Sequence, residues 1–255
     1  MYPCICGAGL EEHAYLPQHD GGCRRTGCLE YVPAPAAPPP PPRGVYIELE
    51  GPDGCGKSTQ ARLLVDGLTA AGHRTWLAAQ PTADTRIGKL IRDMLAGREA
   101  VRDRRTLPLL FAADRMEYSC EIRDLVSRGA IVIGDRGALS TWAYATAAAR
   151  AAEDAHAEAV SRWSDALSDF AFQPALVLVL TLPAEECARR LAKRGGKRDL
   201  LEADALRQHV IDCYDEALDS RLGRVVQRIN AGGSVEEVHE RVLATVLAAI
   251  AAARG

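Results

Sequence analysis

The segment from Gly51 to Thr59, GPDGCGKST, constrains the fold more than any other part of this chain. It fits the pattern G-x-x-x-x-G-K-[ST], and it stands between a short β-rich run at 45–50 and a segment of helical spacing at 57–71. Glycines let backbone N–H groups curl around phosphate oxygens, and the N-terminus of a following helix attracts the same anion. Lys57 adds a positive charge, and the Ser58 hydroxyl can ligate Mg²⁺. The segment therefore predicts a loop that holds a nucleoside triphosphate, most simply ATP, through Gly51, Asp53, Gly54, Cys55, Gly56, Lys57, Ser58 and Thr59.

Beyond this loop, apolar runs alternate with segments of helical spacing. Strands that are apolar throughout and alternate with helices are typical of a parallel sheet covered on both faces. The sequence therefore predicts an α/β fold with a five-stranded parallel sheet flanked by helices. The expected strands are 45–50, 74–79, 130–135, 175–182 and 224–230, and the expected helices are 57–71, 87–96, 107–127, 141–169 (more than one), 183–193 and 203–219. A last helix is expected to begin after Ser234, with Glu237 placed for a capping box.

Asp135 ends the apolar run AIVIGD. A carboxylate that ends a strand next to the phosphate loop can orient the water shell of Mg²⁺. An aspartate in this position is also a common turn residue. The sequence therefore offers Ser58 and Asp135 as candidate Mg²⁺ ligands and leaves the turn as the alternative for Asp135.

Four segments of the chain resemble the thymidylate kinase family, whose members transfer the γ-phosphate of ATP to dTMP. They are ELEGPDGCGKSTQ (48–60), LLFAADRMEY (109–118), DRGALSTWAY (135–144) and RRLAKRGGKRDLLE (189–202), and they follow the family order within 44–253. The resemblance implies the P-loop nucleoside monophosphate kinase fold, ATP and dTMP as substrates, Mg²⁺ as cofactor and a homodimer. Because the acceptor phosphate is itself the nucleophile, such a site needs positioning and positive charge rather than a general base.

The resemblance also implies roles for individual residues at the acceptor. Asp53 would lie near the sugar, Phe111 would stack on thymine and Arg115 would hydrogen-bond the base. Arg136 would hold the acceptor phosphate. Ser140 and Thr141 would line the base pocket, and Tyr144 would pack beside the sugar. Core packing is the alternative for Phe111 and Tyr144, and a surface ion pair, for example with Glu121, is the alternative for Arg115.

The basic segment 189–202 lies where the family has its mobile lid. A basic run is usually a solvated helix face, but a cationic flap would also neutralise the charge of the transferred phosphoryl group. Cys55 replaces an arginine that some members carry in the loop, so the cations of the lid are expected to supply this charge. Arg194 is the first candidate. Arg190 and Arg198 rank behind it and are expected to contact ATP, and the expected catalytic set is Lys57, Arg136 and Arg194.

Three departures from the family pattern leave room for another acceptor, such as dUMP or a modified pyrimidine monophosphate. The family's D-R-Y becomes D-R-G, so that Gly137 replaces an aromatic residue. Around Pro81 the expected charged residue is missing, since Gln80 and Thr82 are neutral and the nearest cation is Arg86. The lid's D-R-x-E becomes Asp199-Leu200-Leu201-Glu202.

A proline-rich stretch divides the chain. Seven of its fourteen prolines fall in 33–42, and such a run forms stiff polyproline helix. We expect a Cys-rich module at 1–32, a linker at 33–43 and the kinase-like domain at 44–255. Four cysteines of the module could bind a structural Zn²⁺, which a short module needs for stability; the alternative is a tail with incidental cysteines. They are Cys4, Cys6, Cys23 and Cys28.

The composition bounds the partners and the location. A net charge of −3 gives no general argument for nucleic acid or a membrane as partner. The N-terminus lacks the pattern of a secretory signal, so a cytoplasmic location is expected. Two other functions stay open: a kinase for another pyrimidine monophosphate or a nucleoside, and a zinc-anchored protein that binds nucleotide without transferring phosphate.

Overall fold

The computed structural model describes residues 44–195, 199–221 and 226–254. The expected linker at 33–43 and Arg198 lie outside the described residues, and so do the four candidate zinc ligands Cys4, Cys6, Cys23 and Cys28.

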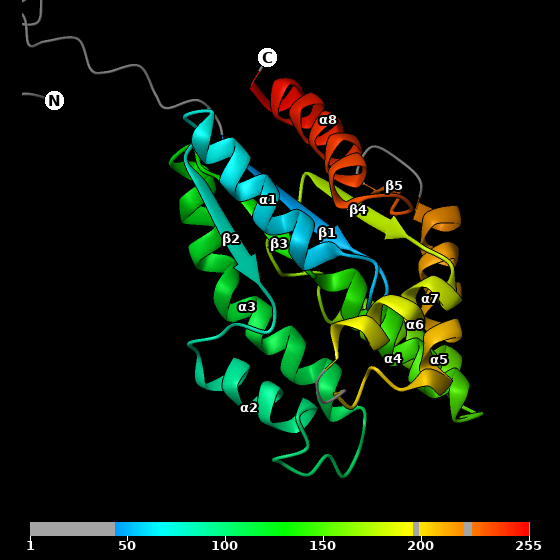
Figure 1. Ribbon diagram of the computed structural model, residues 1–255. Helices are drawn as coiled ribbons and strands as arrows, with labels where there is room; N and C mark the ends of the chain where they lie inside the picture. The colour runs from blue at the N-terminus through cyan, green and yellow to red at the C-terminus, as the bar shows by residue number, and fades with distance from the viewer. Residues whose placement is uncertain (1–43, 196–198, 222–225, 255) are drawn as a thin grey trace, which may run out of the picture. The chain divides into compact units, whose positions relative to one another are not determined.

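Five parallel strands form the sheet, as the sequence predicts (Figure 1). Their spatial order is β2-β3-β1-β4-β5. The chain therefore leaves β1 on one side to build β2 and β3, and returns to its other side for β4 and β5. Ligands of such sheets bind at the carboxyl ends of the strands, where the order switches. The strands are β1 (Val45–Glu50), β2 (Thr75–Ala79), β3 (Ile131–Asp135), β4 (Leu176–Thr181) and β5 (Val226–Asn230).

The helices of the described residues follow the predicted segments closely. They are α1 (Lys57–Ala70), α2 (Arg86–Leu95), α3 (Thr106–Ser127), α4 (Ala138–Ala151), α5 (Ala157–Ala166), α6 (Ala184–Arg194), α7 (Asp204–Arg221) and α8 (Val235–Arg254). The main difference lies in 141–169, where α4 begins three residues earlier than expected and a turn separates it from α5. The capping box of α8 is confirmed: Ser234 N donates to Glu237 Oε2 at 2.9 Å, and Glu237 N donates to Ser234 Oγ at 3.2 Å.

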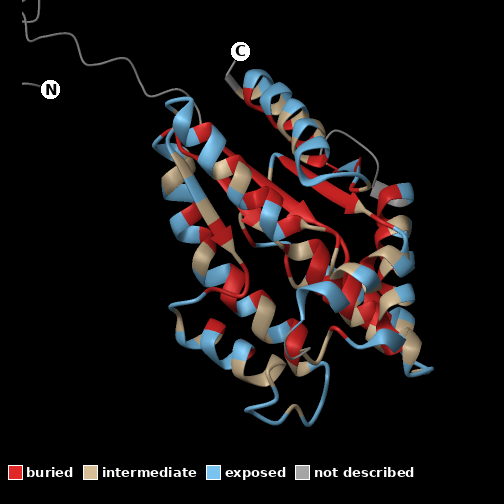
Figure 2. Ribbon diagram, in the orientation of Figure 1, coloured by how far each residue is buried: buried red, intermediate tan, exposed pale blue. Residues whose placement is uncertain are grey.

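The sheet lies between two layers of helices, and its strands are largely buried (Figure 2). Successive side chains of a strand point to opposite faces. One face of β1, including Ile47 and Leu49, packs with α1 and α8 in an apolar core. On the opposite face Tyr46 packs with Ile122 of α3, while α4 and α7 cover the neighbouring residues of β4. None of the helices in the described ranges is long and apolar enough to cross a membrane.

Candidate active site

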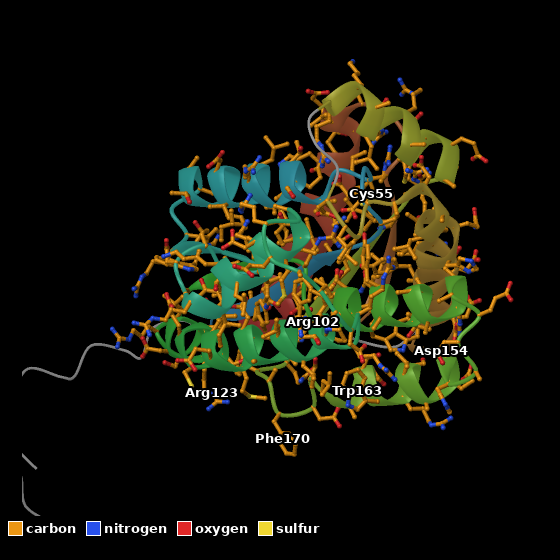
Figure 3. The ribbon with its side chains drawn as sticks, turned by 90° about the horizontal axis from the view of Figure 1, so that it is seen from below. Cys55, Arg102, Arg123, Asp154, Trp163 and Phe170 are labelled. Carbon is orange, nitrogen blue, oxygen red and sulfur yellow. The ribbon has the colours of Figure 1, made fainter. Side chains whose placement is uncertain are left out.

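The phosphate loop follows β1 and leads directly into α1. Its backbone packs tightly against α6: Gly54 has φ +89°, and a Cβ there would lie 2.6 Å from the carbonyl oxygen of Cys187. A side chain at this position is therefore excluded by both conformation and space. Cys55 lies in the interior, whereas Phe170 projects from the loop between α5 and β4 (Figure 3). Ser58 is exposed at the start of α1, next to the buried Lys57.

Lys57 folds back over the loop. Its Nζ donates a hydrogen bond to the carbonyl oxygen of Pro52 at 2.7 Å and lies 3.7 Å from the sulfur of Cys55. With Cys55 buried at 1% exposure, the loop itself offers no second cation. The prediction that the basic segment supplies further positive charge therefore depends on the residues around the loop.

Asp53 connects the phosphate loop to α4 through hydrogen bonds. Its carboxylate accepts hydrogen bonds from Arg136 Nη2 and, at 2.6 Å, from the Tyr144 hydroxyl. The guanidinium of Arg136 also lies over the Tyr144 ring, 5.2 Å from its centroid. Three residues that the sequence assigned to the acceptor thus form one cluster at the edge of the phosphate loop.

The pKa values in this cluster favour charged side chains. Burial alone would raise the pKa of Asp53, but the positive charges of Arg136 and Lys57 and the Tyr144 hydrogen bond lower it below its ordinary value. Burial likewise works against the Arg136 charge, and the neighbouring Asp53 overcomes it and raises the pKa of Arg136. A carboxylate with a lowered pKa is a poor proton acceptor, so Asp53 is suited to positioning rather than to base catalysis.

Glu50 holds Arg136 and the start of α4 in place. Its buried carboxylate accepts the backbone N–H groups of Gly137 and Ser140 at 2.8 and 3.0 Å, and also the hydroxyls of Ser140 and Tyr214. The first free N–H groups of α4 are thereby satisfied from β1, which explains why the helix begins earlier than its own sequence suggests. Arg136, just before this cap, has φ +75°, a rare conformation for a residue with a side chain.

A cavity of about 760 Å³ opens beside this cluster. That size suits a small-molecule ligand. All seven residues that the sequence proposed for substrate binding line it: Asp53, Phe111, Arg115, Arg136, Ser140, Thr141 and Tyr144. They come from the phosphate loop, α3, the β3–α4 corner and α4, which are far apart along the chain.

Arg115 is buried in the wall of this cavity and does not form a surface ion pair. Only 4% of it is exposed. It donates to Ser168 Oγ, the Gly137 carbonyl and Thr141 Oγ1 at 2.6–2.7 Å. Burial lowers the pKa of Arg115 from its usual value, and the carboxylate of Glu48 offsets part of this. The proposed pairing with Glu121 is therefore not the arrangement that the structure has.

The basic segment places its cations in different surroundings. Arg194, at the end of α6, donates to Glu202 Oε1 at 2.6 Å, and its charge helps to lower the pKa of Asp53. Arg190 instead donates to Glu186 Oε1 at 2.8 Å and to the carbonyl oxygen of Ala231 at 3.1 Å. Of these two candidates, Arg194 is therefore the better placed to act on a ligand at Asp53.

The structure adds residues that the sequence argument missed. Residues 199–201 line the cavity, and Leu200 N donates to the carbonyl of Leu95 at 3.0 Å, so the end of the basic segment contacts α2. Arg92 of α2 also lines the cavity, whereas the cation nearest in sequence to Pro81, Arg86, does not. Helical geometry explains the difference, because Arg92 reaches back to the carbonyl oxygens of Pro81 and Thr82. The cation nearest to Pro81 along the chain is therefore not the one that contacts it.

The candidate Mg²⁺ ligands are compatible with that ion. Asp135 ends β3 opposite Leu49 of the adjacent β1, and Ser58 is exposed at the N-terminus of α1. A carboxylate and a hydroxyl at this edge suit a hard cation that keeps several waters and is bound largely through phosphate. Within the described ranges, no group of three or more His, Cys, Asp or Glu side chains forms a metal site made of protein ligands alone.

Comparison with known proteins gives consistent matches. The model of the thymidylate kinase family matches residues 49–242. A probable thymidylate kinase of Thermococcus onnurineus is 36% identical over 210 residues, which cover 79% of this chain and 97% of the relative. Human thymidylate kinase is 35% identical over 201 residues, 78% of this chain and 88% of the human protein. The solved structure of thymidylate kinase from Candida albicans superposes with a TM-score of 0.65 at 29% identity, covering 82% of this chain and 92% of that one.

Proposed function

The chain belongs to the thymidylate kinase family and transfers the γ-phosphate of ATP to dTMP, and we propose that the cavity beside Asp53 is its dTMP site. The observation that carries this proposal is the cluster of Asp53, Arg136 and Tyr144, because it joins the phosphate loop to the wall of the cavity. In-line phosphoryl transfer needs the donor and acceptor phosphates side by side. A cluster that connects the loop to the cavity wall is suited to holding the two phosphates side by side.

In this proposal the phosphate loop holds ATP, and Lys57 neutralises the charge of its terminal phosphates. Ser58 and Asp135, together with water, would hold Mg²⁺, which would supply further positive charge to the phosphates. Arg136 holds the acceptor phosphate: three hydrogen bonds fix its guanidinium on Asp53, Ser140 and Tyr144, and the remaining N–H groups are available to a ligand. Arg194 adds charge from the lid, and Arg92 supplies the cation that the stretch around Pro81 lacks.

In the same proposal Phe111 stacks on the base and Arg115 contacts it, with Ser140 and Thr141 beside them. The hydrogen bond from Tyr144 to Asp53 fixes the ring next to the sugar. Half-burial of Phe111 in the cavity wall supports stacking more than simple core packing.

The test is a transfer assay with ATP, Mg²⁺ and a panel of dTMP, dUMP, dCMP and AMP. We expect dTMP to be the preferred acceptor and dTDP the product. Preference for another pyrimidine nucleotide would change the acceptor but not the reaction, whereas nucleotide binding without transfer would leave only the binding-protein alternative.

A substitution locates the reaction in this cavity. Arg136→Ala should lower kcat/KM for dTMP by roughly 10²–10³-fold, because it removes a preorganised charge at the acceptor phosphate. Arg128→Ala is the matched control, since Arg128 is exposed and pairs with Asp124 away from the cavity. Equal activity in the two variants would contradict the assignment of Arg136.

The N-terminal module and the assembly remain proposals. We propose that Cys4, Cys6, Cys23 and Cys28 bind zinc; metal analysis of the full chain and of a chain without residues 1–42 tests this, and equal zinc in both would exclude the site. We also propose a homodimer, by resemblance to the family, and light scattering of the full chain checks it. The cytoplasmic location stays a prediction.

A further inference from the structure

Gln80, the residue after β2, has a buried side chain whose polar atoms are unsatisfied. It is 7% exposed and lines the cavity beside Asp53. Among the described residues, neither its Oε1 nor its Nε2 has a hydrogen-bond partner. Burying an amide in this state is unfavourable, and most buried polar groups are paired. The position therefore calls for a physical account.

The backbone on both sides of this amide is fixed firmly. Gln80 N donates to the carbonyl of Asp135 at 3.1 Å. Two residues later, Thr82 donates to the carboxylate of Asp114 twice, from its N at 2.8 Å and from its Oγ1 at 2.6 Å. Asp114 immediately precedes Arg115 on α3, so these bonds hold the end of β2 against the turn of α3 that carries Arg115.

Arg115 has an unsatisfied donor of its own. Its two terminal nitrogens are engaged by protein oxygens, but its buried Nε has no partner among the described residues. One of those oxygens is the Gly137 carbonyl, two residues from the Asp135 carbonyl that anchors Gln80. Gln80 and Arg115 thus both donate hydrogen bonds to carbonyl oxygens within residues 135–137, and both line the same cavity.

We propose that Gln80 is a specificity-determining residue that hydrogen-bonds the base of the acceptor nucleotide, together with Arg115 Nε. This inference rests on the proposed function of the cavity as the dTMP site. A glutamine amide offers one acceptor oxygen and two N–H donors, and Arg115 Nε adds one donor. Thymine and uracil present a carbonyl, an N–H and a second carbonyl along one edge. Gln80 Oε1 accepts from that N–H, Gln80 Nε2 donates to one carbonyl, and Arg115 Nε donates to the other.

This arrangement explains why position 80 carries an amide, although an apolar side chain there would stabilise the free protein better. Removing an unpaired buried amide removes its desolvation cost, but it also removes the partner of the base. Stability and substrate affinity are therefore expected to change in opposite directions at this position. A purely structural glutamine would not show this pattern.

Gln80→Met tests the inference, because methionine keeps the length of the side chain and loses the hydrogen-bonding atoms. We expect KM and the calorimetric Kd for dTMP to rise about tenfold, with KM for ATP unchanged and the thermal midpoint raised. Gln80→Glu is the second variant: it replaces the N–H donors with an acceptor that faces a base carbonyl. It should lower kcat/KM for dTMP further.

Gln60→Met is the matched control. Gln60 is also buried, at 2% exposure, but its amide is satisfied by the Val235 carbonyl at 2.9 Å and by His239 Nδ1 at 3.1 Å. It does not line the cavity. Gln60→Met should therefore lower the thermal midpoint and leave KM for dTMP unchanged, the reverse of Gln80→Met.

The outcomes separate this inference from the proposed function. If the wild-type chain phosphorylates dTMP and Gln80→Met has the wild-type KM and Kd, the inference is overturned while the function stands. If the wild-type chain does not phosphorylate dTMP, the proposed function fails, and the Kd values of wild type and Gln80→Met for dTMP, dUMP and dCMP decide the inference. Equal Kd values, or no binding of any of the three, would overturn it; a weaker affinity in the variant would support it.

Discussion

The two faces of β1 differ sharply, although all six residues of the strand are buried. One face carries Val45, Ile47 and Leu49, which pack with α1 and α8. The other carries Tyr46, Glu48 and Glu50 on the side of α3, α4 and α7. The first face removes apolar surface from water, which stabilises the fold without fixing any one side chain. The second face buries two carboxylates, which is unfavourable unless they find partners.

The partners of the polar face show its purpose. Glu50 is satisfied by the start of α4 and by Tyr214, so it fixes the corner that carries Arg136. Glu48 accepts the Tyr46 hydroxyl at 2.6 Å and lies against Gly137. The apolar face thus stabilises the fold. The polar face positions the cavity wall, and burying its two carboxylates lowers the stability of the fold. Each of the following predictions tests whether the two faces of β1 have these separate roles.

The largest stability effect is expected on the apolar face. Ile47→Ala should lower the free energy of unfolding by about 2–5 kcal/mol, because Ile47 is fully buried and its truncation leaves a cavity. Urea unfolding measures this change. At a temperature where the variant remains folded, KM for dTMP should equal that of the wild type. A large rise in KM would show that the two faces are not separate.

The next effect concerns the charge of Glu48. Burial, and then the nearby charge of Glu50, raise the pKa of this carboxyl from 4.5 to about 7, against the opposing hydrogen bond from Tyr46 and the charge of Arg115. Because the folded protein holds this proton more tightly than the unfolded chain, the stabilisation is complete below about pH 4.5. It is lost as the pH rises through about 7.

Glu48→Gln should remove this pH dependence. A difference of about 2.5 pKa units corresponds to roughly 3 kcal/mol, so the variant should gain up to this much relative to wild type between pH 5 and pH 8.5. Urea unfolding of both proteins across this range gives the difference directly. Ile47→Ala is the control, because its loss of stability should not depend on pH. Parallel curves for Glu48→Gln and wild type would show that Glu48 does not titrate in this range.

The sequence predicted the apolar face better than the polar one. Apolar runs and helical spacing place the strands, α1 and α8 because these signals are local and periodic. The loop motif likewise identifies Lys57 and Asp53 from spacing alone. The early start of α4 could not be predicted in this way, because its cap is Glu50, which lies 87 residues before Gly137 in the chain. A charged residue in an otherwise buried strand was the available signal.

The same limit applies to the cavity. Block resemblance located Phe111, Arg115 and Tyr144, since these residues stand in recognisable segments. Arg92 and Gln80 were missed as lining residues, because their place depends on how the end of β2 meets α2 and α3. Such contacts are set by tertiary packing, and no periodic pattern in the chain records them.

The smallest effect concerns Gly137, where the family pattern has an aromatic residue. Its φ is −158°, which any residue adopts, but a Cβ there would overlap the carboxylate of Glu48. Glu48 thus fills the space that a side chain at 137 would need, and the two positions are complementary. Gly137→Ala should therefore cost about 1–3 kcal/mol through overpacking. In the background of Glu48→Ala the same change should cost markedly less, because the clashing atoms are gone. A double-mutant cycle by urea unfolding measures the coupling, and additive costs would mean that the polar face tolerates a side chain at 137 without help from Glu48.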